Sequence, residues 1–249
     1  MTDKETLRAQ WAAYAADWID RIRQDRDVSR VALLDDAMLA AVGDVAGKRV
    51  IDLGCGEGRF GRMLAGRGAE VLGVDLQPLF IEHATASRVG AEKYLVGDME
   101  ELEGIPDEAF DLAVSYLSLV DVPNLAAALA QAARVLRPGG RLVACNLAPM
   151  ATAGSGWIRN GRGEKLHFEL DRYFDEGPRE YSFPPSRTRI TNFHRTQQTM
   201  VRAFAAAGLA LEDYAEPRPT PEQCRRWPDI ADIARVPLFA IYSLRRHVR

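Results

Sequence analysis

The sequence predicts an α/β protein built on an open, mostly parallel sheet. Apolar segments typical of strands alternate with helical segments between residues 48 and 148, a pattern that favours parallel strands joined by helical crossovers. A glycine-rich turn follows the first of these strands, in "VIDLGCGEG" at 50–58. Acidic residues end several strands, and open α/β sheets bind ligands at that edge.

Composition narrows the functional class. The chain has 249 residues, of which 47% are hydrophobic and 27% charged, as in ordinary globular proteins. A net charge of −3 gives no reason to expect nucleic acid as a partner. Three widely spaced cysteines favour a reducing compartment over a disulfide framework. With no bilayer-length apolar run and a polar first segment, we expect a cytoplasmic protein without membrane contact, and the oligomeric state stays open.

Residues 1–44 are expected to form two helices, the second over 31–42. Thr2 and Glu5 fit a capping box for the first helix. Its apolar residues recur at helical spacing and form one face. They are Leu7, Trp11, Tyr14, Trp18 and Ile22. These helices either cap a ligand site or simply pack against the core.

The core is expected to comprise 45–148 and 196–249. Its strands are predicted at 48–55, 69–76, 91–98, 110–119, 141–148, 209–217 and 238–246, and its helices at 61–68, after Gln77-Pro78, at 125–136 and at 196–208. Pro78 fits a first helical turn, Asn124 fits an N-cap, and Pro138-Gly139-Gly140 ends the preceding helix.

Residues 149–195 interrupt this alternation. So long a connection is usually functional, so we predict a lid or substrate-binding insertion. Its aromatic residues are candidates for the wall of an apolar pocket, namely Trp157, Phe168, Tyr173, Phe174, Tyr181, Phe183 and Phe193. Arg187, Arg189 and Arg195 form a possible anion clamp. The alternative is a small antiparallel patch with solvated arginines.

The glycine turn allows two registers. Gly56, Gly58 and Gly61 match the dinucleotide fingerprint G-x-G-x-x-G, which would extend the strand to Cys55. That register would bury an acid and a glycine inside a parallel strand, which is unfavourable. The other register ends the strand at Asp52-Leu53 and turns at 54–58. Asp52 then lies at the ligand-binding edge, where it suits a ligand that carries positive charge.

Five motifs resemble the class I S-adenosylmethionine-dependent methyltransferases, in the small-molecule, quinone-biosynthesis-like group of methyltransferase type 11. They are "VIDLGCGEG" at 50–58, "GVD" at 73–75, "GDMEEL" at 97–102, "FDLAVS" at 110–115 and "VLRPGGRLV" at 135–143. The resemblance implies a Rossmann-like, seven-stranded, mostly parallel sheet with an antiparallel last strand and a lid insertion between strands five and six. It also implies S-adenosylmethionine as cofactor and S-adenosylhomocysteine as product.

The resemblance further implies roles for individual residues. The glycine turn would approach the methionine moiety, Asp75 the ribose, Asp98 and Met99 the adenine, and the end of strand four the donor methyl. The cofactor-binding residues so implied are Tyr14, Asp52, Gly54, Cys55, Gly56, Asp75, Leu76, Asp98, Met99, Ser115 and Tyr116. Gly58 and Gly61 belong to the same motif, but their role can be helix–sheet packing alone and not cofactor binding.

Methyl transfer needs positioning of a nucleophile, and a general base where the nucleophile is a hydroxyl. The tentative base candidates are His194, His167 and Asp121. The sequence contains no metal-binding motif such as C-x-x-C or H-E-x-x-H, so we expect no metal. The loop "SYLSLVD" lacks the Asn/Asp-Pro-Pro-aromatic tetrad of many N-methyltransferases, so we expect an oxygen or carbon nucleophile on a metabolite.

Three other readings remain open. The first is a nicotinamide-dependent oxidoreductase that uses the G-x-G-x-x-G register. The second is an S-adenosylmethionine-binding protein without catalysis. The third is a methyltransferase that acts on protein or RNA.

Overall fold

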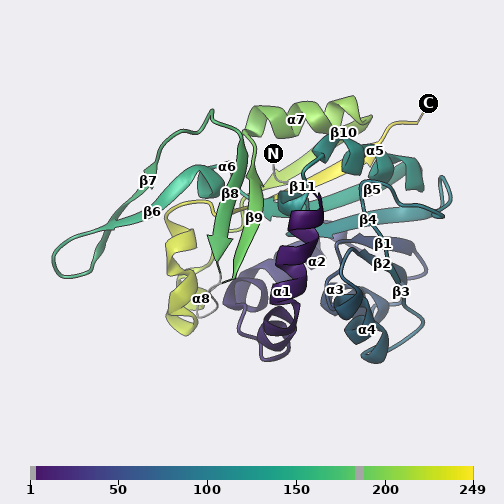
Figure 1. The fold of residues 1–249 in the computed structure, drawn as a ribbon, viewed down its shortest axis with the longest axis horizontal. Coiled ribbons are helices and arrows are strands. Elements are labelled where there is room, and N and C mark those ends of the chain that lie inside the picture. Colours follow the sequence, from purple (N-terminus) through teal and green to yellow (C-terminus); the bar gives the residue numbers. More distant parts are fainter. Residues whose placement is uncertain (1–3, 183–187, 249) are drawn as a thin grey trace.

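The computed structural model describes residues 4–182 and 188–248 and has three layers, with a sheet between two sets of helices (Figure 1). The sheet has seven strands in the order β10-β11-β5-β4-β1-β2-β3. Only β11 runs antiparallel to its neighbours β5 and β10. This arrangement confirms the predicted α/β class, including the antiparallel last strand.

The strands of the main sheet are β1 (Arg49–Leu53), β2 (Glu70–Asp75), β3 (Lys93–Val96), β4 (Phe110–Tyr116), β5 (Leu136–Leu147), β10 (Leu209–Ala215) and β11 (Phe239–Arg246). The helices are α1 (Lys4–Arg23), α2 (Asp35–Val42), α3 (Arg59–Ala65), α4 (Pro78–Ala86), α5 (Leu125–Val135), α6 (Pro149–Ala153), α7 (Gln197–Ala206) and α8 (Pro221–Arg226). Shorter turns are η1 (Arg30–Leu34), η2 (Leu119–Asp121) and η3 (Pro228–Ala234).

Each face of the sheet buries its own apolar cluster. Helices α5 and α7 cover one face, where Leu129 and Phe204 are fully buried. Helices α2 and α3 cover the other face, where Met38 and Leu64 are buried. Local signals fix the ends of several helices. For example, the side chain of Asn124 accepts a hydrogen bond from the backbone N–H of Ala127 at the start of α5.

Several boundaries differ from the sequence prediction; for example, β5 begins at Leu136 rather than at 141, so Pro138-Gly139-Gly140 lies within the strand. Two of the differences affect the pocket. The helix expected over 31–42 begins with a wider π-helical turn, η1, before α2. The strand expected to reach residue 119 ends at Tyr116, because Leu117 adopts a left-handed backbone conformation with φ of 59°. The chain therefore leaves the sheet early and forms η2 at the edge where ligands bind.

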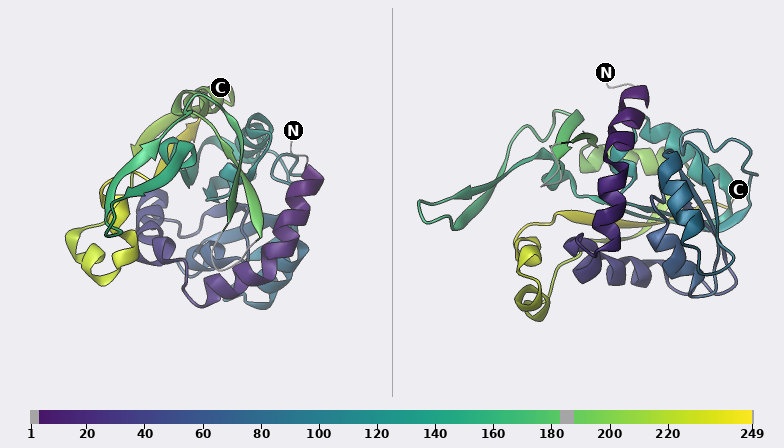
Figure 2. Two further views of the ribbon diagram at one scale, coloured as in Figure 1. Left: turned by 60° about the vertical axis from the view of Figure 1, so that its left-hand side comes forward. Right: turned by 60° about the horizontal axis from the view of Figure 1, so that its bottom comes forward.

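Helix α1 crosses that edge of the sheet, between α4 and strand β9 (Figure 2). Residues 149–195 add two antiparallel hairpins, β6 (Gly154–Arg159) with β7 (Lys165–Leu170) and β8 (Gly177–Ser182) with β9 (Arg189–His194). The β6–β7 hairpin projects away from the sheet, whereas β9 contacts α1 and η2. Within 4–182 and 188–248, no helix combines the length and apolar character needed to cross a bilayer.

Candidate active site

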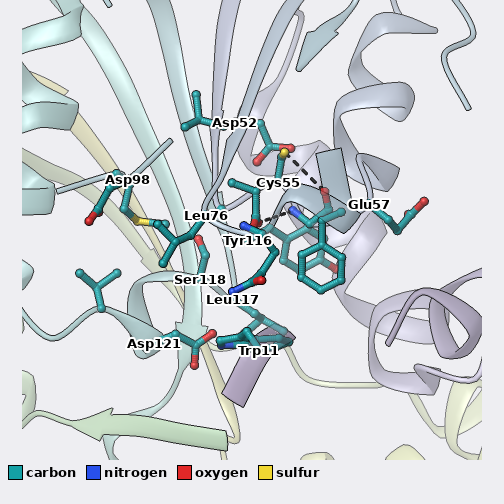
Figure 3. Close-up of a pocket in the computed structure, with 18 of the residues that line it drawn as sticks. Trp11, Asp52, Cys55, Glu57, Leu76, Asp98, Tyr116, Leu117, Ser118 and Asp121 are labelled. Atoms are coloured by element: carbon teal, nitrogen blue, oxygen red, sulfur yellow. Dashed lines mark hydrogen bonds between the residues drawn. The ribbon is translucent and has the colours of Figure 1, made fainter. Parts of the chain in front are cut away.

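A pocket opens where the parallel strands end, beneath α1 (Figure 3). Its floor comes from residues at the carboxyl ends of β1, β2 and β4 and from the segment after β3. One stripe of α1 lines it from above, comprising Lys4, Leu7, Trp11, Trp18 and Ile22. The pocket therefore combines a polar floor with a largely apolar, aromatic roof.

The glycine turn adopts the register that ends the strand at Leu53. Gly54 follows with φ of 72°, and its N–H donates to the carbonyl of Val74 at 2.8 Å. A side chain on Gly54 would lie 2.4 Å from Cβ of Ser118, so only glycine fits here. Gly54, Cys55 and Gly56 all line the pocket.

Asp52 is the most deeply buried acid of the pocket. Its side chain is 1% exposed, and Oδ2 has no hydrogen-bond partner among the described residues. Burial and, to a lesser extent, the neighbouring charge of Asp75 raise the pKa of Asp52 to about 7, while the charge of Arg30 opposes the rise. A buried carboxylate oxygen without a donor is costly, so this site favours a cationic or hydrogen-bond-donating ligand.

Asp75 ends β2 and faces the same pocket. Its Oδ2 accepts a hydrogen bond from the N–H of Gly56 at 2.8 Å, and its Oδ1 accepts one from the N–H of Gln77 at 2.9 Å. Burial raises the pKa of Asp75 to about 6, and these backbone donors limit the rise. Because a carboxylate has about four acceptor positions, Asp75 keeps capacity for ligand hydroxyls.

The segment after β3 supplies Asp98 and Met99, which line the pocket together with Leu76. Lys4 of α1 reaches Asp98 Oδ2 at 2.7 Å and Glu100 Oε2 at 2.8 Å. This ion-pair cluster joins the start of α1 to the floor, so Asp98 is partly engaged in holding the roof.

Tyr116, at the end of β4, lines the pocket with its ring. Its hydroxyl donates to Asp35 Oδ1 at 3.1 Å, and the Arg30 guanidinium lies 4.3 Å from the ring centroid. Ser115, expected beside the donor methyl, lies outside the lining instead. It is fully buried and shares a 2.6 Å hydrogen bond with Ser118, which is the serine that lines the pocket.

Tyr14 also lies outside the pocket lining, contrary to expectation. It is buried within the aromatic cluster of α1, with its ring centroid 6.2 Å from Trp11 and 6.1 Å from Trp18. These two tryptophans line the pocket. The three rings share one apolar face of α1, so the rotation of the helix about its axis decides which of them reach the pocket. Because α1 packs on α4 and β9, Tyr14 is buried in a cluster with Phe80 and Ile190.

Of the three base candidates, Asp121 is the one that lines the pocket. Burial raises its pKa to about 8, while a hydrogen bond from the side-chain amide of Asn192 opposes that rise. Figure 3 shows Asp52, Asp98 and Asp121 on different sides of the same space.

The two histidines have other positions. His194 is fully buried away from the lining, with Nδ1 2.6 Å from Thr152 Oγ1 and Nε2 2.8 Å from the carbonyl of Tyr173. Both partners lie within 149–195, so His194 joins separate parts of the insertion to one another. His167 is exposed on β7, in the hairpin that projects from the sheet. Neither histidine lines the pocket.

The expected arginine clamp does not assemble among the described residues. Arg189 is exposed and pairs with Glu180, and Arg195 donates to backbone carbonyls of the η2 loop. Arg187 lies outside the described residues, as do Phe183 and Thr2 of the capping box. The aromatic residues of the insertion that we expected in the wall of an apolar pocket do not line the pocket, as far as the structure describes them. Trp157, for example, packs on Phe168 within the β6–β7 hairpin.

Sequence reasoning missed Arg30 and Ser118. Arg30 lines the pocket from η1, and its charge lowers the pKa of both Asp52 and Asp121. Ser118 donates to the carbonyl of Leu53 and so fixes the loop after β4 against the glycine turn. Their only signal in the sequence was position: Arg30 directly precedes the predicted second helix, and Ser118 lies near the end of the predicted fourth strand.

Comparisons with known proteins agree with this geometry. A family model described as a methyltransferase domain matches residues 51–144. The chain is 39% identical over 113 residues to malonyl-[acyl-carrier protein] O-methyltransferase of Serratia marcescens, covering 45% of this chain and 44% of that protein. It is 31% identical over 137 residues to a ubiquinone biosynthesis O-methyltransferase of Xanthomonas oryzae, covering 53% of this chain and 57% of that protein. The chain thus spans about half the length of these curated relatives.

A solved structure extends the likeness to nearly the whole fold. The S-adenosylmethionine-dependent methyltransferase from Mesorhizobium loti is 33% identical, with a TM-score of 0.76, and the match covers 85% of this chain and 96% of that one. This chain therefore belongs to the S-adenosylmethionine-dependent methyltransferases.

Proposed function

We propose that this protein transfers the methyl group of S-adenosylmethionine to an oxygen or carbon nucleophile of a small molecule. The observation that carries the proposal is the buried carboxylate of Asp52, whose Oδ2 has no described partner and which lies in a pocket at the strand ends. S-adenosylmethionine bears an ammonium and a sulfonium and no phosphate, so its charge complements this acidic floor.

The residues present fit that cofactor. Asp52 can accept from the ammonium, Asp75 can accept from ribose hydroxyls, and Met99 offers an apolar contact for a purine. Arg30 also lines the pocket and supplies positive charge suited to the carboxylate of the methionine moiety. Gly54 and Gly56 allow the backbone to approach, since neither carries a side chain. When bound, S-adenosylmethionine supplies a methyl carbon already activated by its sulfonium.

The loop after β4 forms one end of the pocket, where Asp121 is accompanied by the apolar residues Leu117, Val122 and Pro123. We propose that this end holds the acceptor, excludes water and places its nucleophile near Asp121. Asp121 would then accept the proton of a hydroxyl. Because its pKa is about 8, we expect the transfer rate to rise as the pH increases toward that value.

The relatives support the choice of acceptor atom, since two of them are named O-methyltransferases. We further propose that α1 and the β8–β9 hairpin form the cover of the site, with 45–148 and 196–249 as its core and 149–195 as the insertion. A cytoplasmic location fits the three free cysteines, two of which are buried. The acidic net charge favours a small-molecule partner over nucleic acid.

Purified protein, methyl-labelled S-adenosylmethionine and a size-fractionated cell extract test the proposal. We expect label in the small-molecule fraction, lost in Asp75→Ala and retained in the control Asp213→Ala, an exposed acid on β10. Label in protein or RNA would contradict the proposal of a small-molecule substrate and would indicate a macromolecular one. Binding of S-adenosylmethionine without any label transfer would favour a non-catalytic binding protein.

A further inference from the structure

We infer that strand β9 holds the proposed base in place, with Asn192 as the positioning residue for Asp121. The inference rests on the proposed function, because that function gives Asp121 its role. The observation behind it is a hydrogen bond from Asn192 Nδ2 to Asp121 Oδ1, between residues 71 positions apart in the chain.

This bond selects between the two oxygens of the carboxylate. Asn192 lies in the middle of β9, and its side chain is buried. Its amide occupies Oδ1 of Asp121, so Oδ2 is the oxygen left to take a proton from a ligand. A side chain held in this way needs no rotamer search before it accepts a proton, which is what a positioned base requires.

A second contact from the same segment holds the backbone around Asp121. The Arg195 guanidinium, one residue beyond β9, donates to the carbonyls of Leu119, Val122 and Pro123. Burial lowers the pKa of Arg195 to about 10, so the group stays charged at neutral pH. Asn192 and Arg195 therefore fix both the carboxylate and the loop that carries it.

The same strand also contacts the roof of the pocket. The N–H of Thr191 donates to Gln10 Oε1 of α1 at 3.0 Å. Ile190 is fully buried in the cluster formed by α1 and Phe80 of α4. Strand β9 thus joins the cover of the pocket to the loop bearing Asp121, which gives the insertion a direct structural link to the reacting end.

An amide donor stabilises a carboxylate more than a carboxylic acid. The groups that face Asp121 are Asn192 from β9, Asp75 from β2 and Arg30 from η1. Removal of the Asn192 amide leaves burial and the charge of Asp75 opposed by Arg30 alone. We therefore expect the pKa of Asp121 to rise by about one unit in Asn192→Leu, as expected for one lost hydrogen bond to a charged group.

Carbon-13 NMR of protein labelled at aspartate carboxyl carbons measures this directly, and Asp121→Asn identifies the signal. The matched control is Arg189→Ala on the same strand as Asn192, which loses an exposed ion pair with Glu180 of β8 and leaves Asp121 untouched. We expect the titration midpoint to move in Asn192→Leu and to stay in Arg189→Ala. An unchanged midpoint in Asn192→Leu, or an equal shift in both variants, would overturn the inference.

A measurement on the wild type covers the case in which Asn192→Leu fails to fold. The side-chain amide of Asn192 should change its nitrogen-15 shift with the same midpoint as Asp121, and this change should vanish in Asp121→Asn. An amide signal that is flat with pH would contradict the contact.

Calorimetry with S-adenosylhomocysteine separates this inference from the proposed function. We expect Asn192→Leu to bind S-adenosylhomocysteine with wild-type affinity, because Asn192 is not part of the pocket lining. Failure of the wild type to bind it would refute the proposed function, whereas the titration of Asp121 would still decide the role of Asn192.

Discussion

Replacement of Asp52 by asparagine should make the ligand-free protein more stable, and increasingly so at higher pH. The ordinary pKa of the carboxyl is 3.8, and burial raises it to about 7 in the folded state. The folded state therefore binds this proton more tightly than the unfolded state, so ionisation costs stability as the pH rises from the lower value through the higher one. Linkage gives a cost of about 1.5 kcal/mol at about pH 5 and about 4 kcal/mol at about pH 8.

Urea unfolding of the wild type and Asp52→Asn at these two pH values measures the effect. The stability advantage of Asp52→Asn should grow by about 2.5 kcal/mol between them. A pH-independent difference would reflect packing or the new amide donor and would refute the idea of an uncompensated buried carboxylate. The same variant should bind S-adenosylhomocysteine more weakly, because its neutral amide no longer attracts an ammonium.

Two further predictions follow from the same geometry. Gly54→Ala should destabilise the fold by about 2–4 kcal/mol, because φ is positive and the new Cβ meets Ser118. Gly56→Ala should cost only about 1–2 kcal/mol, since the nearest atom to its new Cβ is 3.9 Å away. Thermal unfolding compares the two variants, and equal losses of stability would contradict the close approach at Gly54. His194→Ala should lower the free energy of unfolding by about 2–3 kcal/mol, because two buried hydrogen bonds are lost. Its affinity for S-adenosylhomocysteine, measured by calorimetry, should not change. A loss of affinity at constant stability would show that His194 contributes to ligand binding.

The pocket positions of Asp52, Gly54 and Asp75 were predictable because these residues lie at strand ends. The position of Asp52 before the glycines distinguished the two turn registers, and the structure ends β1 at Leu53 as that reasoning required. Asp75 ends β2 for the same reason. Because strands alternate with helices, the parallel strands all end at the same edge of the sheet. A residue at a predicted strand end can therefore be placed at that edge from the sequence alone.

The part of the pocket formed by α1 and the loop after β4 depends on tertiary packing that no local pattern encodes. Ser118 rather than Ser115 lines the pocket because the left-handed conformation of Leu117 turns the chain out of the sheet. The choice of Trp11 and Trp18 over Tyr14 depends on how α1 rotates against its neighbours, since all three share one helical face.

Calorimetric titration of the wild type with S-adenosylmethionine tests most directly whether this pocket is built for that cofactor. We expect binding at about pH 6.5 accompanied by proton release, seen as a dependence on the ionisation enthalpy of the buffer, because a cationic ligand favours the ionised forms of Asp52 and Asp75. Asp75→Ala should weaken binding, and NADH should not bind. Absence of S-adenosylmethionine binding, or tighter binding of NADH, would contradict the assignment of this site.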